Sequence, residues 1–141
     1  MKKSTIFKIL TIAILVLAPL FLSGYAPIKK GLILFNSEPI TEKNALKDQK
    51  AFRSGSKVYY LFIAPKKMKN DFIRVQVFKM TDKAPWGGHE VQRTKDYRLM
   101  FDERYYHTNY FTLYETGRYV MQVFSHDDFF RPLAVNDFYI E

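Results

Sequence analysis

The stretch 113–124, LYETGRYVMQVF, constrains the fold of this chain more than any other. Side chains alternate along a β-strand, so Tyr119, Met121 and Val123 fall together on one apolar face. The opposite face carries Arg118, Val120, Gln122 and Phe124. Glu115-Thr116-Gly117 precedes the strand as a turn signal, because glycine adopts positive φ angles without strain. The pattern predicts a strand that starts after a tight turn and buries one face.

The spacing Leu113-x-Glu115-x-Gly117-x-Tyr119-x-Met121 resembles the Leu-x-Asp-x-Gly-x-Tyr-x-Cys signature of strand F in immunoglobulin-like domains. Glu115 stands where Asp is usual, and Met121 where Cys is usual. The resemblance implies a tyrosine corner, in which the Tyr119 ring is buried and its hydroxyl bonds the backbone near residues 113–115. It implies a β-sandwich and nothing specific about activity.

Further strands are predicted by alternating or continuous apolar runs with turn residues between them. They span residues 31–36, 57–64, 72–80, 105–114, 118–125 and 133–140, and one further strand is predicted within 91–102, best placed at 97–101. Residues 38–50 are predicted to form an irregular connection with a possible short helix, and Asn136-Asp137 a β-bulge. The fold class is therefore an all-β, antiparallel immunoglobulin-like sandwich of about seven strands behind an N-terminal hydrophobic helix. A transthyretin-like sandwich and a small barrel are the alternatives.

Residues 1–26 have the composition of an export signal, followed by a linker at 27–30 and one domain at 31–141. Lys2, Lys3 and Lys8 precede an apolar run over residues 9–22, a length typical of a signal peptide and short for a transmembrane helix. Pro27 would directly follow a cut after residue 26, which favours an uncleaved membrane anchor as the alternative. In both cases the domain is expected outside the cytoplasm, on the periplasmic or cell-surface side.

The absence of cysteine excludes a disulfide framework, a zinc-thiolate site, a cysteine nucleophile and lipidation on cysteine. Positive charge is concentrated near the N-terminus. Residues 27–69 hold ten Lys or Arg against three Asp or Glu, whereas residues 70–141 hold nine against eleven. Basic patches among aromatics also suit single-stranded nucleic acid, but the export signal argues against that partner.

The candidate contact residues lie in three loops. In an immunoglobulin-like sandwich, the loops at 65–71 and 126–132 lie at the end where the first strand starts. We therefore expect six residues to gather beside the membrane: Lys66, Lys67, Lys69, Phe129, Phe130 and Arg131. Trp86, in the Pro-Trp-Gly-Gly loop, is a candidate partner anchor or a cover over the end of the core.

No catalytic, metal or cofactor site is predicted. His126-Asp127-Asp128 offers cation ligands, with His107 as a possible fourth, but most such loops are hydrated turns. Ser125, His126 and Asp127 are sequential neighbours that strand alternation would point apart, which disfavours a catalytic triad.

These patterns predict a non-enzymatic, membrane-proximal interaction module or accessory subunit of an envelope protein assembly. It would bind protein partners and contact the membrane through its N-terminal segment, without nucleic acid. The alternative is a secreted or periplasmic inhibitor or ligand-binding module, and a remote third class is a metal-dependent enzyme.

The residue at which the mature protein starts distinguishes an uncleaved anchor from a cleaved signal peptide. Because Pro27 would hinder signal peptidase, we expect slow or absent cleavage and an intact mass that includes residues 1–26. Intact-mass measurement on protein from its native envelope checks this. A mature chain that starts at Pro27 would contradict the anchor and favour the soluble binding module.

Overall fold

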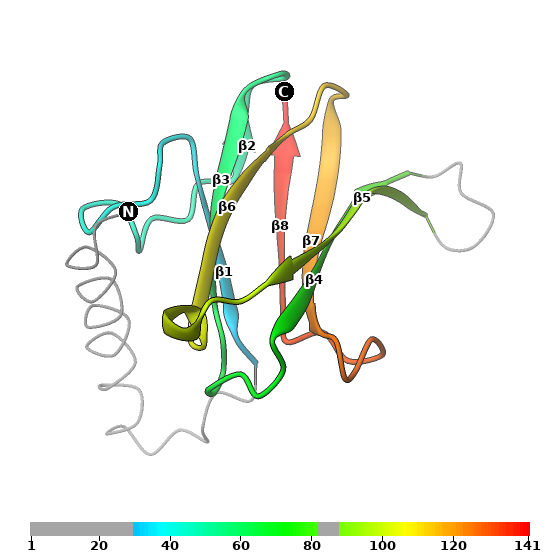
Figure 1. Cartoon of the computed structure of the whole chain (residues 1–141). Helices are drawn as coiled ribbons and strands as arrows, with labels where there is room; N and C mark the ends of the chain where they lie inside the picture. Colours follow the sequence, from blue (N-terminus) through cyan, green and yellow to red (C-terminus); the bar gives the residue numbers. More distant parts are fainter. Residues whose placement is uncertain (1–29, 82–87) are drawn as a thin grey trace, which may run out of the picture.

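A computed structural model describes residues 30–81 and 88–141 of the chain (Figure 1). It contains eight strands and one short 3-10 helix. In order they are β1 (Leu32–Asn36), β2 (Ala51–Phe52), β3 (Lys57–Ile63), β4 (Phe72–Met80), β5 (His89–Arg98), η1 (Phe101–Glu103), β6 (Tyr106–Thr112), β7 (Gly117–Ser125) and β8 (Ala134–Ile140). The segment 1–29 and Trp86 lie outside the described residues.

The strands form two sheets that pack face to face (Figure 1). One sheet has the order β1-β3-β6, and the other has the order β2-β8-β7-β4-β5. All pairs are antiparallel except β2 with β8, which run parallel. In immunoglobulin lettering the sheets are A-B-E and A′-G-F-C-C′, so the chain is an immunoglobulin-like β-sandwich without a D strand.

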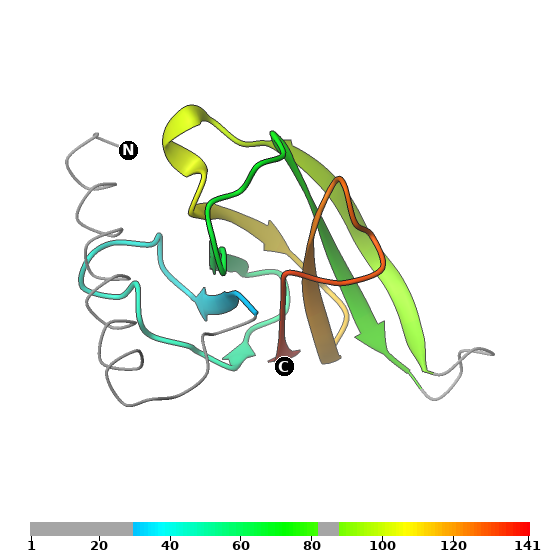
Figure 2. The ribbon, with the colours of Figure 1, turned by 90° about the horizontal axis from the view of Figure 1, so that it is seen from below.

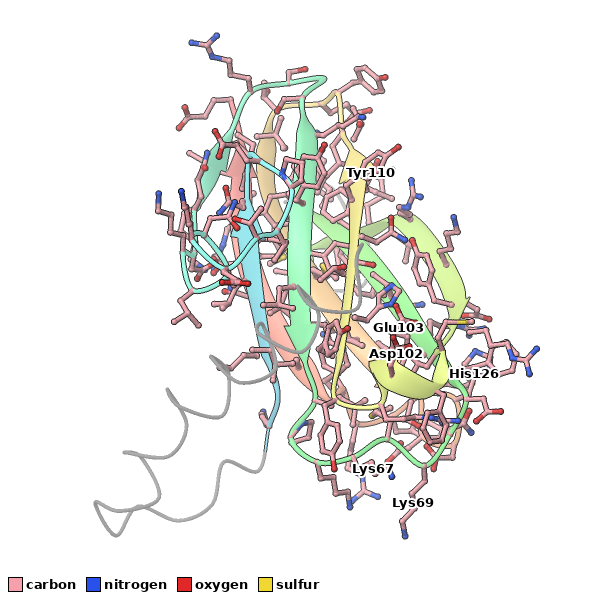
Figure 3. All side chains as sticks on the ribbon, turned by 60° about the vertical axis from the view of Figure 1, so that its left-hand side comes forward. Lys67, Lys69, Asp102, Glu103, Tyr110 and His126 are labelled. Carbon is pink, nitrogen blue, oxygen red and sulfur yellow. The ribbon has the colours of Figure 1, made fainter. Side chains whose placement is uncertain are left out.

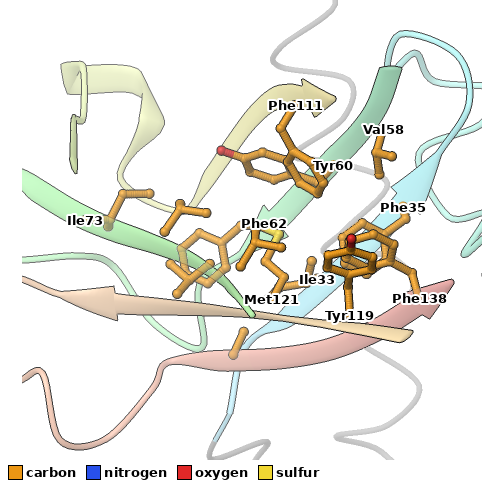
Figure 4. Packing of buried hydrophobic residues seen from close by; sticks show 14 of the residues in the cluster. Ile33, Phe35, Val58, Tyr60, Phe62, Ile73, Phe111, Tyr119, Met121 and Phe138 are labelled. Atoms are coloured by element: carbon orange, nitrogen blue, oxygen red, sulfur yellow. The ribbon is translucent and has the colours of Figure 1, made fainter. Parts of the chain in front are cut away.

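The core between the sheets is rich in aromatic side chains (Figure 4). Tyr119 from β7 lies against Phe138 from β8, with ring centroids 5.6 Å apart and planes 14° apart. Phe138 in turn reaches Phe35 and Phe111 of the opposite sheet, at centroid distances of 4.7 and 5.7 Å. Close aromatic pairs add to the stabilisation from apolar burial, so these rings join the two sheets.

The structure confirms the tyrosine corner. The Tyr119 ring is 0% exposed, and its hydroxyl donates a 2.7 Å hydrogen bond to the backbone carbonyl of Glu115. Burial raises the pKa of this hydroxyl above its usual value. Gly117 has a φ of 143°, a conformation that side-chain-bearing residues rarely adopt, and it turns the chain into β7.

Two details of the predicted strands were wrong. β5 is the strand expected within 91–102, but it spans His89–Arg98 instead of the favoured 97–101, and residues 101–103 form η1. β5 is an edge strand with mostly exposed side chains, so it lacks the apolar alternation that marks a half-buried strand. The bulge predicted at Asn136-Asp137 is absent, since the β7–β8 register runs without a shift from Gly117 to Val123.

Asn136 breaks the apolar alternation of β8 for a different reason. Its side-chain amide donates a 2.7 Å hydrogen bond to the carbonyl of Ile33 in the other sheet and also contacts the Asp48 carboxylate at 3.1 Å. The connection 38–50 forms a single turn, closed by a 2.9 Å bond from the Ala45 N–H to the Thr41 carbonyl, and no helix. It leads into β2, which the sequence did not indicate.

Replacement of Tyr119 by Phe tests the corner. The change removes one buried hydrogen bond and keeps the ring, so we expect the free energy of unfolding to fall by about 1 kcal/mol. Urea denaturation measures this. Tyr139→Phe is the matched control on the neighbouring strand, because Tyr139 is exposed, and it should leave stability unchanged. Equal effects of the two changes would contradict the corner's role.

Candidate functional site

Three loops meet at one end of the sandwich, shown from below in Figure 2. They comprise residues 64–71, 99–105 and 126–133, which together form what we term the loop end. Backbone hydrogen bonds join them: His126 N–H to Phe72 O (3.3 Å), Leu99 N–H to Asp71 O (2.6 Å) and Met68 N–H to Arg104 O (2.8 Å). Gly31 N–H bonds Leu133 O at 2.6 Å, so the chain enters β1 at this same end.

The lysines of the first loop point into solvent. Lys66, Lys67 and Lys69 are exposed, whereas Met68 between them is buried in the core and holds the loop down. Figure 3 shows Lys67 and Lys69 projecting from the loop end, far from Tyr110 toward the other end of β6. The ion pairs among the described residues do not involve these three ammonium groups.

The two phenylalanines of the 126–133 loop differ in their surroundings. Asp128 Oδ1 accepts the backbone N–H groups of Phe130 and Arg131, at 3.0 and 3.1 Å, and these bonds lower the pKa of Asp128. The resulting turn leaves the Phe130 side chain 96% exposed. Phe129 is partly covered instead, because the Arg74 guanidinium lies 4.3 Å above its ring.

An ion pair under Phe129 attaches this loop to the sheet. Arg74 makes two hydrogen bonds to Asp96 across β4 and β5, at 2.8 and 2.9 Å. Arg74, and to a lesser extent His126, lowers the pKa of the Asp96 carboxyl. His126 Nε2 lies 3.1 Å from the same carboxylate, and its ring contacts those of Phe72 and Phe129. His126 thus packs as a structural residue of the loop.

The loop end has further exposed apolar residues that the sequence analysis did not identify. Met100 is 63% exposed and Phe101 is 89% exposed, in the turn that leads through η1 to β6. Glu103 fixes this turn by accepting the Met100 N–H at 2.8 Å. Glutamate three residues after a helix start is a capping signal, but Met100 lacks the hydroxyl that would have made the pattern recognisable.

The structure separates His107 from the loop residues that were weighed with it as cation ligands. His107 is buried between the sheets beside Tyr60 and Tyr97, whereas His126 lies on the outer face of the other sheet. Within residues 30–81 and 88–141, no three His, Cys, Asp or Glu side chains group as a metal site. The same residues contain no helix that is long and apolar enough to cross a membrane.

His107 is the most perturbed base in the described chain. Only 5% of the residue is exposed, and burial lowers its pKa to about 4. Tyr60 and Tyr97 pack against the ring at centroid distances of 6.0 and 4.7 Å, and Glu103 Oε1 lies 3.9 Å from Nδ1. Burial likewise raises the pKa of Tyr60, so both groups are neutral near pH 7.

No protein family model matches the chain, and the search of curated proteins found no match. Among solved structures, an immunoglobulin-like protein from Pseudomonas aeruginosa is 15% identical, with a TM-score of 0.49 over 77% of this chain and 91% of that one. A superoxide reductase from Ignicoccus hospitalis is 8% identical, with a TM-score of 0.46 over 84% and 89% of the chains. The immunoglobulin-like assignment rests on the strand order and the tyrosine corner.

Buried neutral His107 predicts loss of stability in acid. Its folded-state pKa is about 4, below the usual value near 6.5, so only the unfolded chain takes up this proton as the pH falls from 6.5. By pH 4 the loss reaches roughly 3 kcal/mol, at about 1.36 kcal/mol per pH unit. Urea denaturation across this range measures the loss.

His107→Leu should remove that component of the pH dependence, because leucine does not titrate. His89→Gln, at an exposed position, is the control and should keep it. An unchanged pH dependence in His107→Leu would show that other groups cause the acid sensitivity.

Proposed function

We propose that this chain is a non-enzymatic, extracytoplasmic interaction module, held beside a membrane by its N-terminal segment as an accessory subunit of an envelope protein assembly. One observation carries the proposal. The loops that expose Phe101, Phe130 and the lysines 66, 67 and 69 share the end at which the chain arrives from its N-terminal segment. A tether at residues 27–30 keeps that end close to the bilayer.

The exposed side chains suit a lipid headgroup region. Burying a phenylalanine side chain contributes about 1.5–3 kcal/mol, and Phe101 and Phe130 have almost their whole surface available. A lysine near anionic headgroups contributes about 1 kcal/mol. Basic residues next to aromatic ones are typical of surfaces that lie in the interface without spanning it.

Two of the five acidic residues at the loop end form ion pairs with arginines. Asp71 pairs with Arg104 at 2.6 Å, and Asp128 pairs with Arg131 at 3.0 Å. Asp102 and Asp127 are exposed, and Glu103 is half-buried beside His107. The five Lys and Arg of the three loops balance their five Asp and Glu, so the positive charge that would meet anionic lipid is local to the exposed lysines 66, 67 and 69.

Fluorescence quenching by brominated lipids tests the orientation of the full chain in nanodiscs. In a Trp86→Phe background, Phe130→Trp should be quenched, because the loop end lies at the interface. Tyr114→Trp is the matched control at the opposite end. Tyr114 is 75% exposed, and its carbonyl accepts the Ser54 hydroxyl beside the end of β8, so it should not be quenched.

Changing Lys66, Lys67 and Lys69 to Ser should reduce the quenching of Phe130→Trp in anionic nanodiscs and change little in zwitterionic ones. Absence of quenching at Phe130 in both lipids would contradict a membrane-facing loop end. The exposed Phe101 and Phe130 would then be assigned to contact with a protein partner instead of lipid.

A further inference from the structure

The sandwich has four sheet edges, and its own residues cover the outer edge of β1. The Ile33 carbonyl accepts the Asn136 amide at 2.7 Å. The Phe35 N–H donates to Asp48 at 3.2 Å, and the Phe35 carbonyl accepts the Gln49 N–H at 2.9 Å. The Ile33 carbonyl and both backbone groups of Phe35, which face away from β3, are therefore occupied.

Two further edges have features that discourage pairing. β2 has two residues, too few to template a new strand. β5 is long but carries Glu90, Arg93, Lys95, Asp96 and Arg98, and its register with β4 shifts between Val77 and Phe78. Short edges, charges and bulges are the usual protections of a sheet edge.

The edge of β6 has none of these protections. Its sequence, YHTNYFT, contains no proline, glycine, lysine, arginine or carboxylate, and its register with β3 runs without a shift. Among the described residues, β3 is the one strand that pairs with β6. The D strand that pairs here in many immunoglobulin domains is missing, because the chain passes from β5 through η1 directly into β6.

The direction of the free backbone groups follows from the antiparallel ladder. The Ala64 N–H donates to the Tyr105 carbonyl. The backbone N–H and C=O groups of odd-numbered residues in β6 therefore bond to β3, and those of even-numbered residues point away from β3. The Tyr110 N–H, on the outward side, is bonded to the neighbouring Asn109 side chain at 2.8 Å. Thr108 and Thr112 thus present N–H and C=O groups to the open side of the sheet.

A basic groove of about 380 Å³ runs beside this edge. It is lined by Arg93, Lys95, Asn109, Tyr110, Phe111, Thr112 and Tyr114, without a carboxylate. Arg93 and Lys95 pair with the buried residues Val77 and Val75, so they lie on the face of β5 that is turned toward the other sheet. Every second side chain of a strand added to β6 would face these two cations.

We propose that the free edge of β6 accepts an extended acidic segment of a partner protein as a fourth strand of the β1-β3-β6 sheet. Main-chain hydrogen bonds to Thr108 and Thr112 give the affinity, and Arg93 and Lys95 select carboxylates at alternate positions. A second copy of this chain fits less well, because pairing of two β6 edges would place the cations of both copies along one seam. The inference rests on the proposed partner-binding role but not on membrane contact.

Two end-blocked peptides probe the edge, one alternating Val with Glu and the other Val with Lys. With the full chain in non-ionic detergent, fluorescence anisotropy should show binding of the Glu peptide and at least about tenfold weaker binding of the Lys peptide. Detergent removes the bilayer, so failure here and failure of lipid quenching are separate results. Equal binding of both peptides, or of neither, would overturn the proposal.

Variants locate the peptide. Thr108→Pro removes an outward N–H without breaking a bond to β3, and it should weaken the Glu peptide about tenfold or more. Thr108→Val keeps the N–H and should bind normally. Arg93→Glu with Lys95→Glu should reverse the preference toward the Lys peptide, which no folding defect would produce. Unchanged affinity in these variants, or a dimer of the chain that Thr108→Pro dissociates, would overturn the proposal.

Discussion

The hydrogen bond from the Tyr119 hydroxyl to the Glu115 carbonyl holds the connection between the two sheets. Residues 113–116 carry the chain from β6 in one sheet to β7 in the other, and this bond fixes where β7 begins. β7 lies between β4 and β8, so its register sets theirs. The Tyr119 ring also lies against Phe138, which reaches Phe35 across the core. A buried tyrosine can do both because one end of its side chain is apolar and the other polar.

Strands that bury one face could be predicted from the sequence, because their pattern of apolar residues records the burial. β4 and β7 alternate in this way and lie where alternation placed them. β5 was placed too late in the chain, at 97–101, because an edge strand with mostly exposed side chains has no such pattern and the apolar residues 99–101 follow it directly. β2 pairs over two residues, too few for any period to be visible. The sequence therefore predicts the centre of each sheet better than its edges.

The candidate site divides in the same way. The lysines and the Phe129-Phe130 pair can be read directly from the sequence. The strand order implied by the tyrosine-corner resemblance was enough to place their loops at one end of the sandwich. The two phenylalanines differ in exposure, and this difference depends on tertiary contacts that the sequence does not reveal. Phe129 is partly covered by Arg74 from β4, whereas the turn at Asp128 directs Phe130 into solvent. Phe101 was missed because its exposure depends on η1, which the sequence pattern did not indicate.

The loop end and the β6 edge have a fixed geometric relation that bears on any partner. β6 begins beside η1 at the loop end and runs along the sandwich toward the end that carries Tyr114 (Figure 1). If the loop end faces a bilayer, the open edge stands roughly upright from it, and a strand added there would also stand upright. In that proposed orientation, an upright segment of a neighbouring protein would run along β6, whereas a segment lying flat on the lipid would cross the edge and could not pair with both Thr108 and Thr112. The two proposals together therefore predict a partner segment that runs along the membrane normal.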